Sequence, residues 1–199
     1  MSYKDLKSYQ GTAIIYDFTV EFCRRYVDPR SRTVDQMVQA ARSGKQNIVE
    51  GAANKTSEKS ELKLLGVARA SLAELLEDYE DFLRQKHLQL WGKDDPRAAA
   101  IRELGYKPDK TYQTYQSYMD APETAANAAL CLIHQVNFLL DRQIRTVETQ
   151  YQERGDYHDQ LKREVKNSWL KQRQEEDDWL RQEVEKYKKK EEEEKKGKE

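Results

Sequence analysis

The three histidines of this sequence are the residues best suited to bind a metal or to act as a base. A carboxylate-bridged metal centre in a helical bundle needs paired Glu-x-x-His motifs that project inward. His87, His134 and His158 instead have Arg, Cys and Gly three positions before them. The spacing therefore predicts no metal site. We interpret His134 as a hydrogen-bonded histidine in a helical core or at its edge, rather than as a base.

No other catalytic arrangement is visible in the sequence. Cys23 and Cys131 are the only cysteines, and they do not form the Cys-x-x-Cys pair that zinc sites use. Each lies in an apolar helical pattern, which predicts a buried free thiol. The sequence has no glycine-rich phosphate loop and no nucleophile elbow. We therefore expect no catalytic residue, no cofactor and no enzymatic activity, and only a convergent polar pocket with perturbed carboxylates would indicate an enzyme.

Carboxylates are concentrated in one helical segment. Four of them are spaced by three and four residues, which places them on one face. These residues are Glu74, Glu77, Asp78 and Asp81. Such a face is either a solvated acidic surface or an electrostatic docking surface, and we treat it as a candidate oligomer or partner interface.

Basic residues are concentrated earlier in the chain. Residues 24–59 contain eight basic and four acidic residues, a net charge of +4, whereas residues 61–150 contain 11 basic and 14 acidic residues, a net charge of −3. The basic side could contact nucleic-acid phosphates. It could also meet the acidic face of a neighbouring subunit in a head-to-tail ring. The candidate nucleic-acid-binding residues are Arg24, Arg25, Arg42, Lys45 and Lys55.

One helical pattern contains two glycines. Glycine in a helix costs about 1 kcal/mol relative to alanine, so Gly44 predicts the close approach of a neighbouring helix, and Gly51 lies at nearly the same angle. Asn47 and Glu50 flank an inward position, and a half-buried polar pair needs partners. Arg69 or a tyrosine hydroxyl could supply them. We interpret these glycines and polar residues as structural, with a ligand or RNA contact as the alternative.

Four amphipathic patterns of three to four turns or more predict the helices that position these residues. The first three run over about 9–27, 32–53 and 58–90, and the fourth opens at Asp120-Ala-Pro-Glu123. Pro29 ends the first helix, because the residue before a proline disfavours the α region. Ser57 is a suitable N-cap for the third.

Residues 91–119 form a long crossing connection between the third and fourth helices. Asp95-Pro96 predicts the start of a short helix that Gly105 ends, and Tyr112, Tyr115 and Tyr118 indicate one or two further turns. Four long helices with one long crossover predict an all-α fold, an up-down four-helix bundle over residues 1–150.

Residues 151–199 have a different composition. Apolar residues become sparse, residues 171–178 contain none, and the chain ends in the low-complexity run KKKEEEEKKGKE. We expect a charged helical tail that frays into disorder. Trp169 and Trp179 are its candidate partner-binding residues.

The composition limits the cellular setting. The net charge of −1 indicates neither nucleic acid nor membrane as a partner. The first ten residues contain no apolar signal region, and no apolar run reaches membrane-spanning length. Because there is also no disulfide framework, we expect a cytoplasmic protein without a membrane partner.

The two-glycine segment also carries a family resemblance. The residues concerned are Ala40-Ala41, Ser43, Asn47-Ile48 and Glu50-Gly51, followed by Ser57, Ser60 and the run Ala68–Glu74. Over roughly residues 5–90 the chain resembles the bacterial four-helix bundle protein family. That family includes proteins encoded within intervening sequences of large-subunit ribosomal RNA genes and the accessory variability determinant of diversity-generating retroelements. Asp78–Trp91 and Asn127–Ile144 resemble the four-helix bundle suffix domain.

This resemblance implies an up-down bundle, a ring-shaped homo-oligomer that is a pentamer in the better-understood relatives, and no enzymatic activity. The retroelement relative binds a reverse transcriptase and nucleic acid through a basic surface. We therefore expect a non-enzymatic oligomeric scaffold or adaptor that binds a protein partner. The alternative is an RNA-binding accessory protein that works with a reverse transcriptase or the ribosome.

Overall fold

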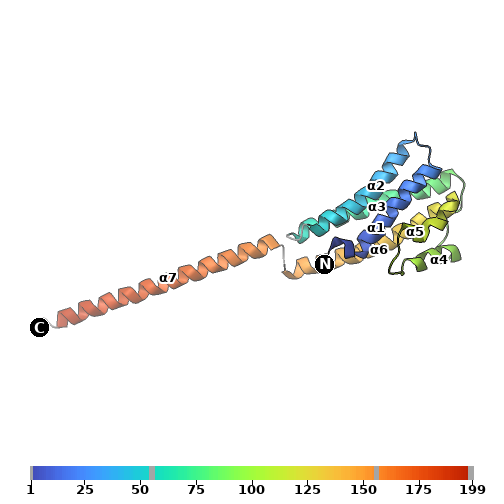
Figure 1. Cartoon of the computed structure of the whole chain (residues 1–199). Helices are drawn as coiled ribbons and strands as arrows, with labels where there is room; N and C mark the ends of the chain where they lie inside the picture. Colours follow the sequence, from blue (N-terminus) through green and yellow to red (C-terminus); the bar gives the residue numbers. More distant parts are fainter. Residues whose placement is uncertain (1, 54–56, 155–156, 197–199) are drawn as a thin grey trace. The chain divides into compact units, whose positions relative to one another are not determined.

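The computed structural model describes residues 2–53, 57–154 and 157–196. Over these residues the chain forms α-helices and two short 3-10 helices and has no β-strand (Figure 1), so the all-α prediction is confirmed. The chain divides into two units, Met1–Glu153 and Arg154–Glu199. We call the first unit the helical domain.

The first half of the helical domain consists of three long helices, preceded by the short 3-10 helix η1 (Tyr3–Asp5). These helices are α1 (Lys7–Tyr26), α2 (Arg32–Ala53) and α3 (Glu58–Gln85). The bounds of α2 are those expected from the sequence, and α1 differs by two residues or fewer at each end. The Oγ of Ser57 accepts a hydrogen bond from the backbone N of Ser60, as expected of an N-cap.

α3 ends five residues earlier than the sequence predicts. His87 has a φ of 55°, a left-handed conformation that stops a helix. The backbone N of Leu88 donates to the O of Leu83 at 2.9 Å, and the N of His87 donates to the O of Arg84 at 3.2 Å. This pattern is a Schellman motif without a glycine. The prediction was wrong because Leu88 and Leu90 continue the helical spacing beyond the actual end.

The crossing connection contains the predicted short helices. α4 (Pro96–Leu104) is capped by Asp95, whose side chain accepts from the backbone N of Arg97, and Gly105 follows its last residue. α5 (Tyr112–Tyr115) and the 3-10 helix η2 (Gln116–Asp120) form the further turns.

α6 (Pro122–Arg154) is buried on more than one face. Every residue from Ala125 to Ile133 is buried, so this helix is covered around more of its circumference than the single buried stripe of an amphipathic surface helix. One side of α6 packs against α1, where Gly11 lies against Val136. The connecting segment covers another side, since Gln135 Nε2 donates to Arg102 O at 2.8 Å.

The core of the helical domain lies between these helices. The ring of Phe22 contacts the rings of Tyr79 and Phe82, each at 4.8 Å between centroids. Both cysteines are buried and free, as predicted. The thiol of Cys23 donates to the sulfur of Met37 at 3.8 Å, which joins the end of α1 to the start of α2.

The second unit is α7 (Tyr157–Lys196), a single helix of 40 residues. At 1.5 Å per residue it is about 60 Å long. It continues without a break through residues 171–178, which contain no apolar side chain. Every side chain described from Leu161 to Glu185 is exposed.

Candidate functional site and interaction surfaces

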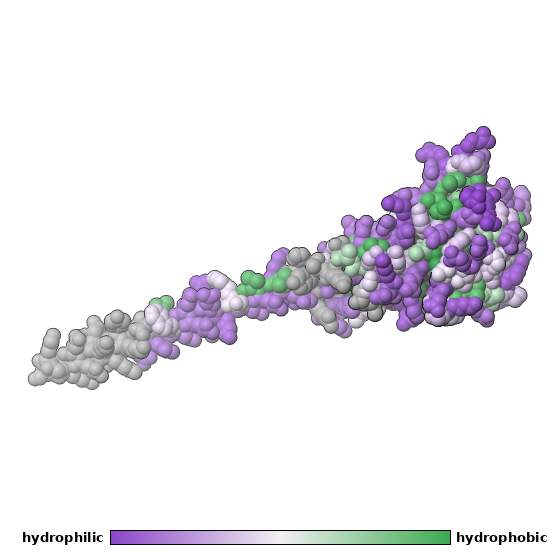
Figure 2. Space-filling model, in the orientation of Figure 1, coloured by the Kyte–Doolittle hydropathy of each residue, from purple (hydrophilic) through white to green (hydrophobic). Residues whose placement is uncertain are grey.

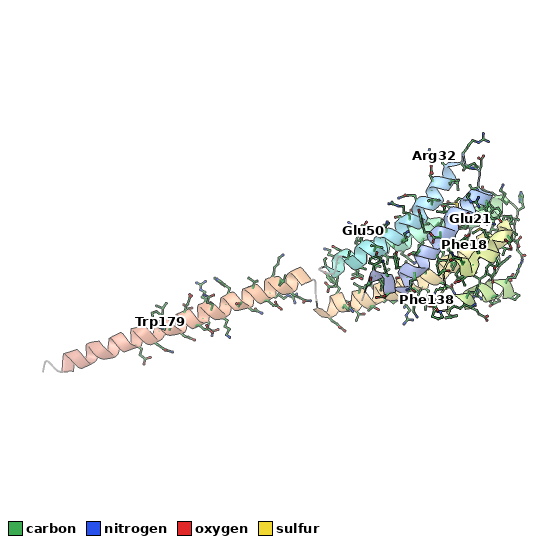
Figure 3. The ribbon with its side chains drawn as sticks, viewed as in Figure 1. Phe18, Glu21, Arg32, Glu50, Phe138 and Trp179 are labelled. Carbon is green, nitrogen blue, oxygen red and sulfur yellow. The ribbon has the colours of Figure 1, made fainter. Side chains whose placement is uncertain are left out.

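Arg24 and Arg25, two of the predicted nucleic-acid contacts, bind one carboxylate near the end of α1. Arg24 donates to Glu21 from Nε and Nη2 at 2.7 Å each, and Arg25 donates from Nε. Hydrogen bonds from these two guanidinium groups lower the pKa of Glu21 to about 2. Arg25 also donates to the backbone O of Met119. Figure 3 shows Glu21 on α1. The cluster therefore ties α1 to η2, and one of its two positive charges is neutralised.

The other basic candidates lie on or after α2. Arg42 is exposed. Lys45 lies with its ammonium 4.1 Å from the ring centroid of Tyr16, which joins α2 to α1. Lys55 is outside the described residues. The structure thus brings Arg24 and Arg25 together at Glu21, whereas Arg42 and Lys45 belong to the middle of α2.

The glycines of α2 face α3. A β-carbon on Gly44 would lie 3.0 Å from Cδ2 of Leu72, which is the close approach predicted for this residue. A β-carbon on Gly51 would be 3.6 Å from Cβ of Leu64, an ordinary contact. The contact between α2 and α3 is therefore close at Gly44 and less close at Gly51, near the end of α2.

Asn47 and Glu50 do not form a buried polar pair. Asn47 is half-buried and its Nδ2 donates to O and Oγ of Ser43, at 2.8 and 3.2 Å. Glu50 is exposed on α2 (Figure 3). Arg69, one of the two kinds of partner considered for them, binds Asp141 of α6 instead, with 3.1 Å between Nε and Oδ1. The expected half-buried pair does not form, because the Asn47 amide donates within its own helix and Glu50 lies in solvent.

The acidic residues of α3 share a surface. Glu74, Glu77 and Asp81 are exposed, and Asp78 is half-buried among them. Burial, together with the charges of Asp81 and Glu74, raises the pKa of Asp78. Arg84 compensates part of this charge by donating to Asp81 at 2.7 Å. A cation that docked here would relieve the crowding of like charges, so the surface suits a basic partner.

A hollow of about 450 Å³ that sequence reasoning missed lies beside Trp91. The indole Nε1 donates to Glu123 at 3.0 Å, and the guanidinium of Arg97 lies 4.1 Å from the ring centroid. The backbone N of Trp91 donates to Asn127 Oδ1 at 2.8 Å. Asn127 is buried in an apolar stretch of α6. A buried amide needs hydrogen-bond partners. An asparagine in this apolar stretch was therefore the one signal in the sequence that could have indicated a polar contact here.

Polar and charged side chains line this hollow, among them His134, Cys131, Glu80, Asp94 and Arg102. Burial raises the pKa of Cys131, which makes its thiol a poor nucleophile. His134 was expected in the core or at its edge, but it is exposed. Within the described ranges, no group of three or more His, Cys, Asp or Glu side chains could hold a metal ion.

The tryptophans of α7 are exposed. Trp169 is 55% exposed and Trp179 is 61% exposed; Figure 3 shows Trp179 projecting from the helix. The guanidinium of Arg173 lies 5.2 Å from the ring centroid of Trp169. Figure 2 shows hydrophobic patches along this otherwise polar helix. Among the side chains of α7 that the structure describes, the other exposed large apolar ones are Leu161, Val165, Leu170 and Leu180.

Comparisons with protein-family models, with curated proteins and with solved structures found no match. Membership of the bacterial four-helix bundle protein family therefore stays a proposal. Among the described residues, no helix combines the length and the apolar character that crossing a bilayer requires.

Proposed function

We propose that this protein is a non-enzymatic, oligomeric scaffold or adaptor that binds protein partners through exposed helix faces. In this proposal α1, α2, α3 and α6 form an up-down four-helix bundle of the kind found in the bacterial four-helix bundle protein family. The contact of Cys23 with Met37 supports antiparallel packing of α1 and α2. Gly44 lies against Leu72 and Gly51 against Leu64, so positions rise along α2 as they fall along α3, which supports antiparallel packing of these two helices.

The observation that carries this proposal is the exposed apolar surface of α7. The helix includes two of the three tryptophans of the chain. Leaving large apolar side chains in water is unfavourable, by about 25 cal/mol for each Å² that a partner could cover. Tryptophan is also enriched among the residues that contribute most to protein–protein binding. A long helix with such side chains in solvent is suited to recognition.

The acidic surface of α3 supports self-association as the second element of the scaffold. Asp78 is half-buried among like charges, and the exposed Arg32 and Arg42 of α2 are cations that another subunit could bring to it. A head-to-tail contact of this type closes into a ring when its rotation permits. The pentamer of the family relatives is one such ring.

Light scattering of the full chain at tens of micromolar tests the proposal. We expect a mass above that of a monomer. The association between subunits should weaken in part as salt rises, because salt screens charge contacts at a surface. A strict monomer at low salt under these conditions contradicts the scaffold.

The exposed Arg32 and Arg42 favour a second candidate function, an RNA-binding accessory protein. Arg24 and Arg25 support it less, because they share Glu21. This candidate predicts that the full chain is retained on structured RNA at low salt and is released steeply as salt rises. Lack of retention on structured RNA at low salt would exclude the RNA-binding function.

A further inference from the structure

We propose that α7 binds α7 of a second copy of this chain, antiparallel, with the two-fold axis between Gln174 and Glu175. This inference rests on the proposed scaffold function and identifies the occupant of one of its surfaces. It commits to a second copy because the charged residues next to the centre of α7, Arg173 and Glu176, lie opposite each other when the helix is reversed.

One face of α7 carries five residues at successive intervals of four, four, three and four, and helical neighbours at these intervals share a face. They are Val165, Trp169, Arg173, Glu176 and Leu180, which we call the α7 face. All five are exposed, Val165 by 68% and Leu180 by 52%. The guanidinium of Arg173 lies over the ring of Trp169, so those two side chains share the same side of the helix. The face is apolar toward both ends and charged in the middle.

When a second copy is reversed about the proposed axis, apolar residues of its α7 face lie opposite apolar residues of the first, and charged residues lie opposite charged ones. Each residue then lies opposite the residue that is equally far from the axis. Trp169 faces Leu180 of the second copy, and Arg173 faces its Glu176; the two-fold repeats both contacts. Two apolar layers therefore flank a pair of ion pairs at the centre. Leu170 and Trp179 lie at the two edges of the face, where they extend its apolar border.

A parallel pair lacks this complementarity. It would place Arg173 against Arg173 and Glu176 against Glu176, and like charges at an interface disfavour association strongly. A charged residue at the seam of a helical pair is also a common means of fixing register and orientation. The two-fold contact is self-complementary, so it closes at two copies.

Charge reversal of the full chain tests the pairing, with dimerisation followed by sedimentation over a concentration series. Arg173→Glu and Glu176→Arg each place like charges at the seam, and we expect the dissociation constant to rise about tenfold or more. The double variant R173E/E176R restores opposite charges and should recover the wild-type constant. Lys171→Glu is the matched control, because Lys171 is exposed on the opposite side of α7, and it should change the constant less than twofold.

A spin label on Asn167→Cys tests the orientation. The residue is exposed, while Cys23 and Cys131 are only 2% and 8% exposed, so the reagent selects the new thiol. In the antiparallel pair the labelled positions are displaced along the helix by 15 residues, about 22 Å. In a parallel pair this displacement is zero.

Three results would overturn the inference. A short distance between labels, with no axial displacement, would show a parallel pair. An oligomer whose mass and dissociation constant are unchanged by the charge reversals would show that α7 binds another partner. That result would leave the proposed scaffold function intact. A wild-type chain that remains monomeric at low salt would contradict both the pairing and the proposed self-association.

Discussion

Gly11 of α1 packs so closely against Val136 of α6 that a β-carbon on Gly11 would collide with Cγ2 of the valine. Gly66 of α3 has open space where its β-carbon would lie. Both glycines are inside long helices, so replacement by alanine gains the same helix propensity at each, about 1 kcal/mol. Their surroundings alone should decide the outcome of that replacement.

We expect Gly66→Ala to raise the free energy of unfolding by about 1 kcal/mol. Gly11→Ala should lower it, because overpacking costs about 1–3 kcal/mol and exceeds the gain in propensity. Urea denaturation of the two variants and the wild type measures the difference. Equal stabilisation by both substitutions would show that α1 and α6 are not in close contact.

The buried hydrogen bond between Tyr79 and Thr19 gives a second prediction. The Tyr79 hydroxyl donates to Thr19 Oγ1 at 3.0 Å, and both side chains are fully buried. Tyr79→Phe leaves the threonine hydroxyl without this donor, so we expect a loss of about 1–3 kcal/mol. A double-mutant cycle with Thr19→Val should give a combined loss smaller than the sum of the two single losses. Strict additivity would indicate that the two hydroxyls do not interact.

The cluster at Glu21 gives a prediction about pH. Its pKa in the folded chain is about 2, below the ordinary value of 4.5, because Arg24 and Arg25 donate to the carboxylate. A lowered pKa contributes stability that is fully present above about pH 4.5 and is lost as pH falls toward 2. The advantage of the wild type over Glu21→Gln should therefore be constant near neutrality and should shrink below pH 4.5.

Denaturation at a series of pH values between 3 and 7 would measure this difference. Asp17→Asn is a matched control, since it removes an exposed carboxylate from the same helix without removing an ion pair of the cluster. A difference between wild type and Glu21→Gln that does not change with pH would refute the role of the carboxylate charge.

The anchoring of Trp91 gives a fourth prediction. Glu123 accepts from Trp91 Nε1 at 3.0 Å and from the backbone N of Gln89 at 3.1 Å. Glu123→Ala should lower the free energy of unfolding by about 1–3 kcal/mol, because two donors lose their acceptor.

Fluorescence tests this anchoring directly. In a background with Trp169→Phe and Trp179→Phe, the buried Trp91 is the one remaining tryptophan, and excitation selective for tryptophan excludes emission from the tyrosines. Its emission should shift to the red when Glu123 is replaced by alanine, since the indole gains contact with water. Asp120→Ala, at an exposed residue just before α6, is the control. An unchanged spectrum in the Glu123 variant would show that the hydrogen bond does not hold the indole.

Local signals in the sequence were enough to predict most of the helices. The bounds of α2 and the capping of α4 by Asp95 were predictable, because helix hydrogen bonds and caps join residues only a few positions apart. The close approach at Gly44 was predictable for a related reason, since a glycine inside a helix is unfavourable unless a neighbour needs the space.

Only the tertiary structure decided how these helices are covered and which polar groups meet. α6 is buried on several sides because the connecting segment folds across it, with Arg102 bound to Gln135 from 33 positions away. The periodicity of α6 itself does not indicate which residues will cover it. The same holds for Arg69, which binds Asp141 from 72 positions away, and for Trp91, which is held by Glu123 and Asn127. Hydrophobic spacing specifies that a face must be buried, but the identity of the covering residues depends on contacts between distant parts of the chain.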